Sequence, residues 1–225
     1  MKYLAFVPLI ALLAGCAPGG DSNNAPAGGS GDLKTSYTAE NAAPAPSDPS
    51  LQEPKFEAPK TGEEVAVLTT KFGKIVFKFR PDLAPKHVEN FKKLVGKGFY
   101  DHTIFHRIIP GFMIQGGDPN TKDKDKVASY GQGGPGYSVK AEFNNLDHKR
   151  GVVSMARSND PNSAGSQFYV VVADSPHLNR EYTAFGEVVS GMDAADRIVA
   201  QPRDGNDMPA ERIEMTAKIE KWPVK

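Results

Sequence analysis

The stretch that decides the fold is FHRIIPGFMIQGGD, residues 105–118. Two extended apolar segments, Thr103 to Ile109 and Phe112 to Gln115, are separated by Pro110 and Gly111, a pair of residues typical of turns. Short runs rich in β-branched and aromatic residues on either side of such a turn predict two strands. The sequence therefore indicates a tight hairpin near the middle of the chain.

Side chains suited to binding lie on this hairpin. Arg107 and Gln115 bracket the turn, and Phe112 and Met113 lie on its flank. A charged donor, an amide and an apolar floor can therefore converge there. A hairpin with a surface arginine and two core residues gives the same pattern, and the residues taken alone favour that simpler interpretation.

The segments on both sides of the hairpin predict further short elements. Apolar residues recur at helical spacing over 88–95 ahead of Gly96, which predicts an amphipathic helix, and a second helix is predicted at 192–199. Apolar runs and alternation predict strands at 65–70, 75–80, 151–155, 167–173, 184–189 and 213–220. Two helices among many short strands indicate a mainly β domain, either a barrel or a sandwich with helical caps.

The first residues, MKYLAFVPLIALLAGC, predict an export signal. Their apolar run is too short to span a bilayer and follows a single charge at Lys2. The ending Leu13-Ala14-Gly15-Cys16 resembles the lipobox of bacterial lipoproteins, and Cys16 is the single cysteine in the sequence. We therefore expect lipidation of Cys16 and a membrane-anchored lipoprotein on the periplasmic face or the cell surface. The alternatives are a plain signal peptide with an incidental cysteine, or a buried thiol.

The composition of the remaining residues predicts two regions, 17–60 and 61–225. Residues 17–60 are rich in Pro, Gly, Ala, Ser and Asn, with few large apolar residues, so we expect a disordered tether. Residues 61–225 are expected to form the folded domain, as a monomer. The 27 basic and 27 acidic residues give zero formal charge, which provides no electrostatic reason for binding nucleic acid.

Conventional catalytic and metal-binding patterns are weak. Ser154 and Ser166 lack the context of a nucleophile between a strand and a helix. His102 and His106 have the spacing of zinc ligands on a helix, but the residues between them, 103–105, are predicted to be extended, and that spacing on a strand does not bring two ligands together as a helix would. The glycines of 131–136 are not followed by lysine, so they do not form a phosphate loop. We expect no metal and no cofactor, and we interpret the charged segment 119–136 as a solvated loop rather than a recruitment site.

Three stretches together resemble the cyclophilin family of peptidyl-prolyl cis-trans isomerases. The first is 105–118; the second joins SMAR (154–157) to NSAGSQFY (162–169); the third is LNREYTAFGEV (178–188). They occur in the family's order, and the likeness covers roughly residues 62–222. The resemblance implies a closed eight-stranded antiparallel barrel capped by two α-helices, and catalysis of rotation about X-Pro bonds in proline-containing, here exported, polypeptides.

The resemblance also implies which residues act. Arg107 and Gln115 are the expected catalytic residues. The expected substrate-binding residues are Phe112, Met113, Ala156, Arg157, Gln167, Tyr169, Leu178 and Tyr182. A module that grips proline-containing chains without turnover, as a holdase, is the alternative function for the same groove.

Three positions depart from the common family pattern. His177 replaces a tryptophan, Tyr182 a histidine and Arg157 an asparagine. Loss of the tryptophan removes a large apolar contact and an indole donor, so we expect weak binding of cyclosporin.

Overall fold

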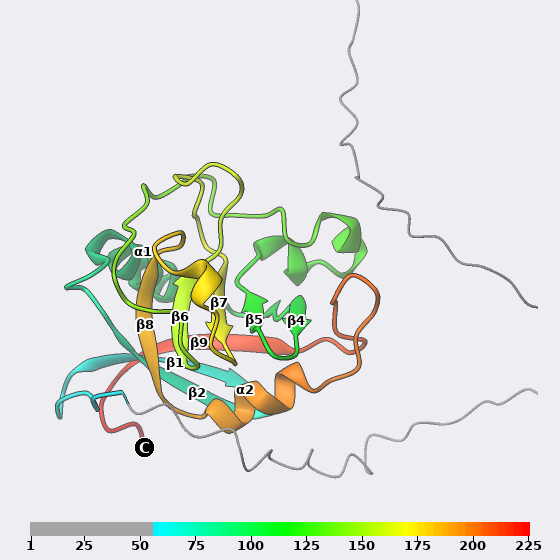
Figure 1. Cartoon of the computed structure of the whole chain (residues 1–225). Coiled ribbons are helices and arrows are strands. Elements are labelled where there is room, and N and C mark those ends of the chain that lie inside the picture. Colours follow the sequence, from blue (N-terminus) through cyan, green and yellow to red (C-terminus); the bar gives the residue numbers. More distant parts are fainter. Residues whose placement is uncertain (1–55) are drawn as a thin grey trace, which may run out of the picture. The chain divides into compact units, whose positions relative to one another are not determined.

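The computed structural model describes residues 56–225, which contain one nine-stranded antiparallel sheet and two α-helices (Figure 1). The helices are α1 (Pro85–Gly96) and α2 (Met192–Val199). The strands are β1 (Glu64–Thr70), β2 (Gly73–Phe79), β3 (Thr103–Ile104), β4 (Arg107–Ile109), β5 (Met113–Gly116), β6 (Val152–Met155), β7 (Phe168–Val171), β8 (Ala184–Ser190) and β9 (Glu214–Lys221). Their order in the sheet is β3-β9-β1-β2-β8-β6-β7-β5-β4.

The sheet curls until its two end strands are neighbours in the chain. Phe105 and His106 alone separate β3 from β4. The N–H of Phe105 donates to Ile213 O at 3.0 Å, beside β9, whereas the N–H of His106 donates to Gln115 O at 3.0 Å, on β5. The expected closed eight-stranded barrel is therefore wrong in detail. The predicted strand 103–109 is divided between two partners, which gives nine strands, and no ladder joins β3 to β4 within residues 56–225.

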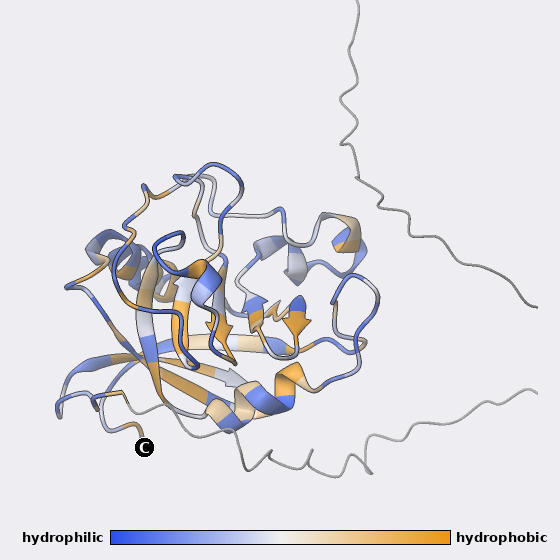
Figure 2. Ribbon diagram, viewed as in Figure 1, coloured by the Kyte–Doolittle hydropathy of each residue, from blue (hydrophilic) through white to orange (hydrophobic). Residues whose placement is uncertain are grey.

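The central strands are buried on both faces. Along β5 and β7, Ile114 and Phe168 join the main core, whereas Met113 and Tyr169, their chain neighbours, join a second apolar cluster on the opposite face. Because both faces are covered, β7 (FYVV) is apolar along its length, whereas β5 (MIQG) has Gln115 as its one polar side chain. In Figure 2 the central strands β6 and β7 are largely orange, whereas many of the connecting loops are blue.

Both predicted helices are confirmed. Helix α1 begins at Pro85, a residue favoured in the first turn, and buries Phe91. The Phe91 ring stacks on Tyr100 at 4.8 Å and meets Phe77 edge-on at 5.4 Å. Helix α2 packs against β2, β4 and β5, well away from α1 (Figure 1). No helix among the described residues is long and apolar enough to cross a membrane.

The segments outside the sheet include short 3-10 helices. Residues 119–136 contain two short 3-10 helices, η2 (Pro119–Lys122) and η3 (Lys124–Ser129), followed by the glycine-rich loop. A third, η4 (Pro176–Leu178), precedes β8. Glu57, within the expected tether, accepts a hydrogen bond through its carbonyl from Lys78 Nζ at 2.7 Å. The expected signal peptide with Cys16 lies outside the described residues.

Candidate active site

Four side chains from four neighbouring strands form a row on the sheet face opposite the main core. Arg107 of β4 pairs with Gln115 of β5, Gln115 pairs with Tyr169 of β7, and Tyr169 pairs with Ser154 of β6. Residues directly opposite each other in antiparallel strands project from the same face. The sheet therefore brings the guanidinium, the amide and the tyrosine ring together.

A pocket of about 170 Å³ lies over this row. It is lined by Arg107, Phe112, Met113, Gln115, Ala156, Arg157, Tyr169, Leu178 and Tyr182. All nine are among the ten residues that the resemblance implies. The tenth, Gln167, lines an adjacent pocket of about 660 Å³. The smaller pocket thus has apolar walls, two arginines and no acidic residue.

The Arg107 side chain is 47% exposed, so its charge is open to a ligand. Its only carboxylate contact among the described residues is long, 3.9 Å from Nε to Asp207 Oδ2. Asp207 itself is held more closely by Arg203, at 3.1 Å, and its carbonyl accepts the Ile108 N–H at 2.8 Å. The loop that carries Asp207 therefore lies beside Arg107 without neutralising it tightly.

The two glutamines connect the pocket to the glycine-rich loop. Gln115 Nε2 donates to Gln167 Oε1 at 3.0 Å, and Gln167 Nε2 donates to the carbonyls of Gly131 and Gly133, each at 2.9 Å. Fully buried Asp118 holds the same loop from its other side, accepting the backbone N–H groups of Gly131 and Gly133. The glycine-rich loop is thus held both through its backbone N–H groups and through its backbone carbonyls.

A histidine packs behind the floor of the pocket. The His148 ring stacks on Tyr169, with centroids 6.2 Å apart, and its Nε2 lies 3.1 Å from Ser154 Oγ. Burial lowers the pKa of His148, although Asn179 opposes this by accepting a hydrogen bond. Burial also raises the pKa of Tyr169, although its interaction with Ser154 opposes this. The floor is therefore neutral at ordinary pH.

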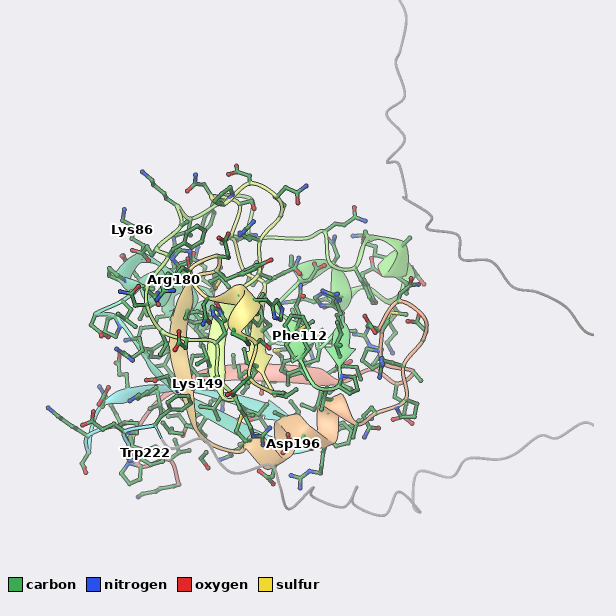
Figure 3. All side chains as sticks on the ribbon, in the orientation of Figure 1. Lys86, Phe112, Lys149, Arg180, Asp196 and Trp222 are labelled. Atoms are coloured by element: carbon green, nitrogen blue, oxygen red, sulfur yellow. The ribbon has the colours of Figure 1, made fainter. Side chains whose placement is uncertain are left out.

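Phe112 lies at the end of the β4–β5 hairpin, beside η4 (Figure 3). Its ring is 5.3 Å from that of exposed His177. Leu178, the last residue of η4, is 94% buried and faces the second apolar cluster with Met113. The hairpin and η4 together therefore build the apolar end of the pocket.

Two larger hollows adjoin the small one. The 660 Å³ pocket includes the glycine-rich loop, Ala156 and Arg157. Another, of about 570 Å³, is lined by Arg107 together with Asp204 and Met208. Gln115 lines all three. An extended peptide can therefore continue beyond the small pocket in two directions.

Sequence reasoning missed the residues that support the site. Asp118, His148 and Asp207 reach it from loops, through contacts that no local periodicity records. Asp118 was within the hairpin stretch, and its position just ahead of Pro119 was the one local signal of a capping residue.

No group of three or more potential metal-binding side chains is found within residues 56–225. His102 and His106 do not share a site: the side chain of His102 is 75% exposed, whereas His106 is 94% buried.

Comparison with known proteins identifies the family. The model described as "Cyclophilin type peptidyl-prolyl cis-trans isomerase/CLD" matches residues 65–219, so this chain belongs to the cyclophilin family. It is a peptidyl-prolyl cis-trans isomerase.

Relatives support the assignment along most of their length. A "Probable peptidyl-prolyl cis-trans isomerase" of Brucella abortus is 50% identical over 140 residues, which covers 60% of this chain and 71% of the relative. "Peptidyl-prolyl cis-trans isomerase B" of Bacillus subtilis is 42% identical over 143 residues, covering 63% and 91%. A solved cyclophilin from Cryptosporidium parvum has 32% identity and a TM-score of 0.63, covering 70% of this chain and 99% of its own.

Proposed function

We propose that this isomerase accelerates rotation about X-Pro bonds without covalent chemistry, through Arg107 beside the apolar pocket. The observation that carries the proposal is that Arg107 shares the 170 Å³ pocket with Phe112 and Tyr169. Peptide-bond rotation is opposed by resonance, with a barrier of about 18–20 kcal/mol. In the twisted amide the nitrogen regains its lone pair, so a positioned donor stabilises that geometry over either planar form.

The arginine suits this role because it stays protonated at any working pH. One hydrogen bond to a charged group contributes about 1.5–3 kcal/mol, and about 1.4 kcal/mol corresponds to a tenfold change in rate. Arg107 therefore supplies on the order of a hundredfold. The remaining acceleration comes from holding the proline ring and the flanking carbonyls in place while the bond turns.

The other lining residues position the substrate. The apolar groups of Phe112, Met113 and Leu178 receive the proline ring, and Gln115 donates to a substrate carbonyl. The backbone at Arg157 pairs with the substrate chain. The Cryptosporidium parvum cyclophilin was crystallised "in the presence of dipeptide ala-pro", which supports a proline-containing ligand for the corresponding groove here.

We further propose that the substrates are exported proteins and that the enzyme is anchored to a membrane through lipid on Cys16. The support is the lipobox-like ending Leu13-Ala14-Gly15-Cys16. Metabolic labelling with a radioactive fatty acid tests the anchor: the wild-type chain should incorporate label and partition with membranes, and Cys16→Ala should do neither. Equal labelling of the two chains would contradict the proposal that lipid is attached to Cys16.

A holdase function is the second candidate, and one observation favours it. The exposed large apolar residues within 56–225 lie around the groove: Val127 lines the 570 Å³ pocket, Tyr137 lines the 660 Å³ pocket, and Phe143 is 5.9 Å from the Arg157 guanidinium. Such residues can grip an unfolded chain.

The amount of protein required separates the two functions. A test protein whose refolding is limited by prolyl isomerisation is refolded with the full chain at about one hundredth of its concentration. An isomerase increases the slow refolding rate at that ratio because each molecule turns over many times. A holdase acts only near equal concentrations and retards refolding. No acceleration at the low ratio would contradict the enzymatic mechanism.

A further inference from the structure

Arg157 occupies the boundary between two hollows. It lines both the 170 Å³ pocket and the 660 Å³ pocket. Its side chain is 16% exposed, far less than that of Arg107, so it forms part of the wall. A peptide that places proline in the small pocket and extends into the larger one must pass this guanidinium.

The guanidinium is held rigidly. Its Nε donates to the carbonyl of Glu181 at 3.0 Å, and its Nη1 donates to the carbonyl of Ser158 at 2.9 Å. Its carbon lies 4.6 Å from the centroid of the Tyr182 ring, within cation–π range. Much of the entropy of ordering this side chain is therefore lost before any ligand arrives, which favours binding through it.

The charge of Arg157 is poorly neutralised. The nearest carboxylate is Glu181 Oε2, 3.7 Å from Nη2, on a side chain that is 66% exposed. Nη2 has no hydrogen-bond acceptor in the described part of the chain, and neither pocket has an acidic lining residue. A fixed, half-buried cation with free donors is a site for a carboxylate, which guanidinium binds through paired hydrogen bonds.

We propose that Arg157 determines substrate specificity by binding the carboxylate of an Asp or Glu within two residues of the substrate proline. The 660 Å³ pocket has room for that side chain, and its polar lining includes Ser158, Ser163 and Gln167. Arg107, the second cation of the groove, reinforces the preference by its charge, and it disfavours Lys or Arg at the same substrate position. The inference rests on the proposed groove function and narrows it to a class of peptide.

The test uses the full chain and matched peptides with one proline. Glu is compared with Gln at each of the two positions before the proline and at the position after it. Both kcat/KM for isomerisation and Kd are measured. At one position or more, the wild-type protein should favour Glu by about three- to tenfold, because a well-oriented, half-buried pair exceeds an exposed one. In Arg157→Gln the Glu-to-Gln ratio should fall most of the way toward one, because only the charge of Arg107 remains, and Arg157→Lys should restore part of it.

Two controls exclude a merely structural role. Glu181→Gln removes the competing carboxylate and should increase the wild-type ratio, and raising the salt concentration should decrease it. Equal kcat/KM and Kd for Glu and Gln peptides at every position, or an unchanged preference in Arg157→Gln, would overturn the inference. Acceleration of the neutral peptides would in that case leave the isomerase mechanism intact. If no peptide were accelerated, the mechanism would fail and the Kd ratios would still decide the role of Arg157.

Discussion

Arg107 and Gln115 lie directly opposite each other across the β4–β5 ladder, and this register places the guanidinium and the amide on one face of the sheet. The next pair in that row, Gln115 with Tyr169, adds the pocket floor. A slip of one residue in either pairing would turn one partner to the opposite face. Strand register therefore determines which side chains share the site, and the contacts between those side chains follow from it.

A substitution at Gly133 tests the clamp on the glycine-rich loop, by which we mean the hydrogen bonds that Asp118 and Gln167 make with Gly131 and Gly133. A Cβ at Gly133 would overlap Asp118 Oδ1, whereas a Cβ at Gly134 would have no atom within 4 Å. Gly133→Ala should destabilise the protein by about 1–3 kcal/mol, because Asp118 must shift from its buried hydrogen bonds. Gly134→Ala is the matched control and should change stability by less than about 1 kcal/mol. Chemical denaturation measures both, and equal effects would contradict the clamp.

Gln167 tests the other side of the same loop. Gln167→Glu keeps the shape of the side chain but replaces the Nε2 donor with an oxygen, so the two hydrogen bonds to Gly131 and Gly133 are lost. We expect faster hydrogen exchange at the loop amides and a decrease of about tenfold in kcat/KM. Gln132→Glu adds the same charge to the same loop without touching the clamp, and it should show neither effect. Similar changes in hydrogen exchange and kcat/KM in the two variants would mean that the added charge, and not the loss of the two hydrogen bonds, causes them.

Buried histidines predict the dependence of stability on pH. Burial lowers the pKa of His87, His106 and His148 below the ordinary value. Below about pH 6.5 the unfolded chain binds protons that the folded chain resists. Stability should therefore be complete above that pH and decrease as the pH falls toward the folded-state values, with a slope of up to about 1.4 kcal/mol per pH unit for each histidine.

Thermal unfolding between pH 7.5 and pH 5 measures this slope before most carboxylates titrate. His148→Gln should make the decrease in Tm shallower, since one of the three histidines no longer contributes. A Tm that is constant over this range would contradict the buried, neutral state of the rings.

His177 predicts the response to cyclosporin. The exposed His177 ring lies 5.3 Å from Phe112 at the rim of the pocket. Because an imidazole covers less apolar surface than an indole, wild-type binding should be weak, and His177→Trp should tighten it by about tenfold. Isothermal titration measures both affinities. Tight, stoichiometric binding by the wild-type protein would contradict the expectation.

Much of this architecture is predictable from sequence, because local pattern determines it. Helix α2 spans Met192–Val199, as its apolar spacing predicts, and the residues of the β4–β5 hairpin meet at one pocket. The split at Phe105 and His106 was not predictable, since apolar residues continue through it and only the remote partners Ile213 and Gln115 divide the strand.

The contacts that support the site were not predictable either, because they join residues that are far apart in the sequence. Asp207 reaches Arg107 from a loop 100 residues later in the chain, and it does so with a left-handed backbone, φ 63°. Nothing in its immediate sequence marks that approach. Sequence similarity indicated the residues that line the groove, but it did not indicate the residues that hold them.

The most direct test of the role of Arg107 compares kcat with peptide affinity in Arg107→Ala. The full-length wild-type and variant chains are mixed with a peptide containing one X-Pro bond, and exchange between its isomers is followed by NMR alongside a binding titration. Lys218→Ala, which removes an exposed charge on β9, serves as the control. Arg107→Ala should lower kcat about a hundredfold while changing Kd by only a few fold. Equal kcat values for the variant and the wild-type protein would contradict it.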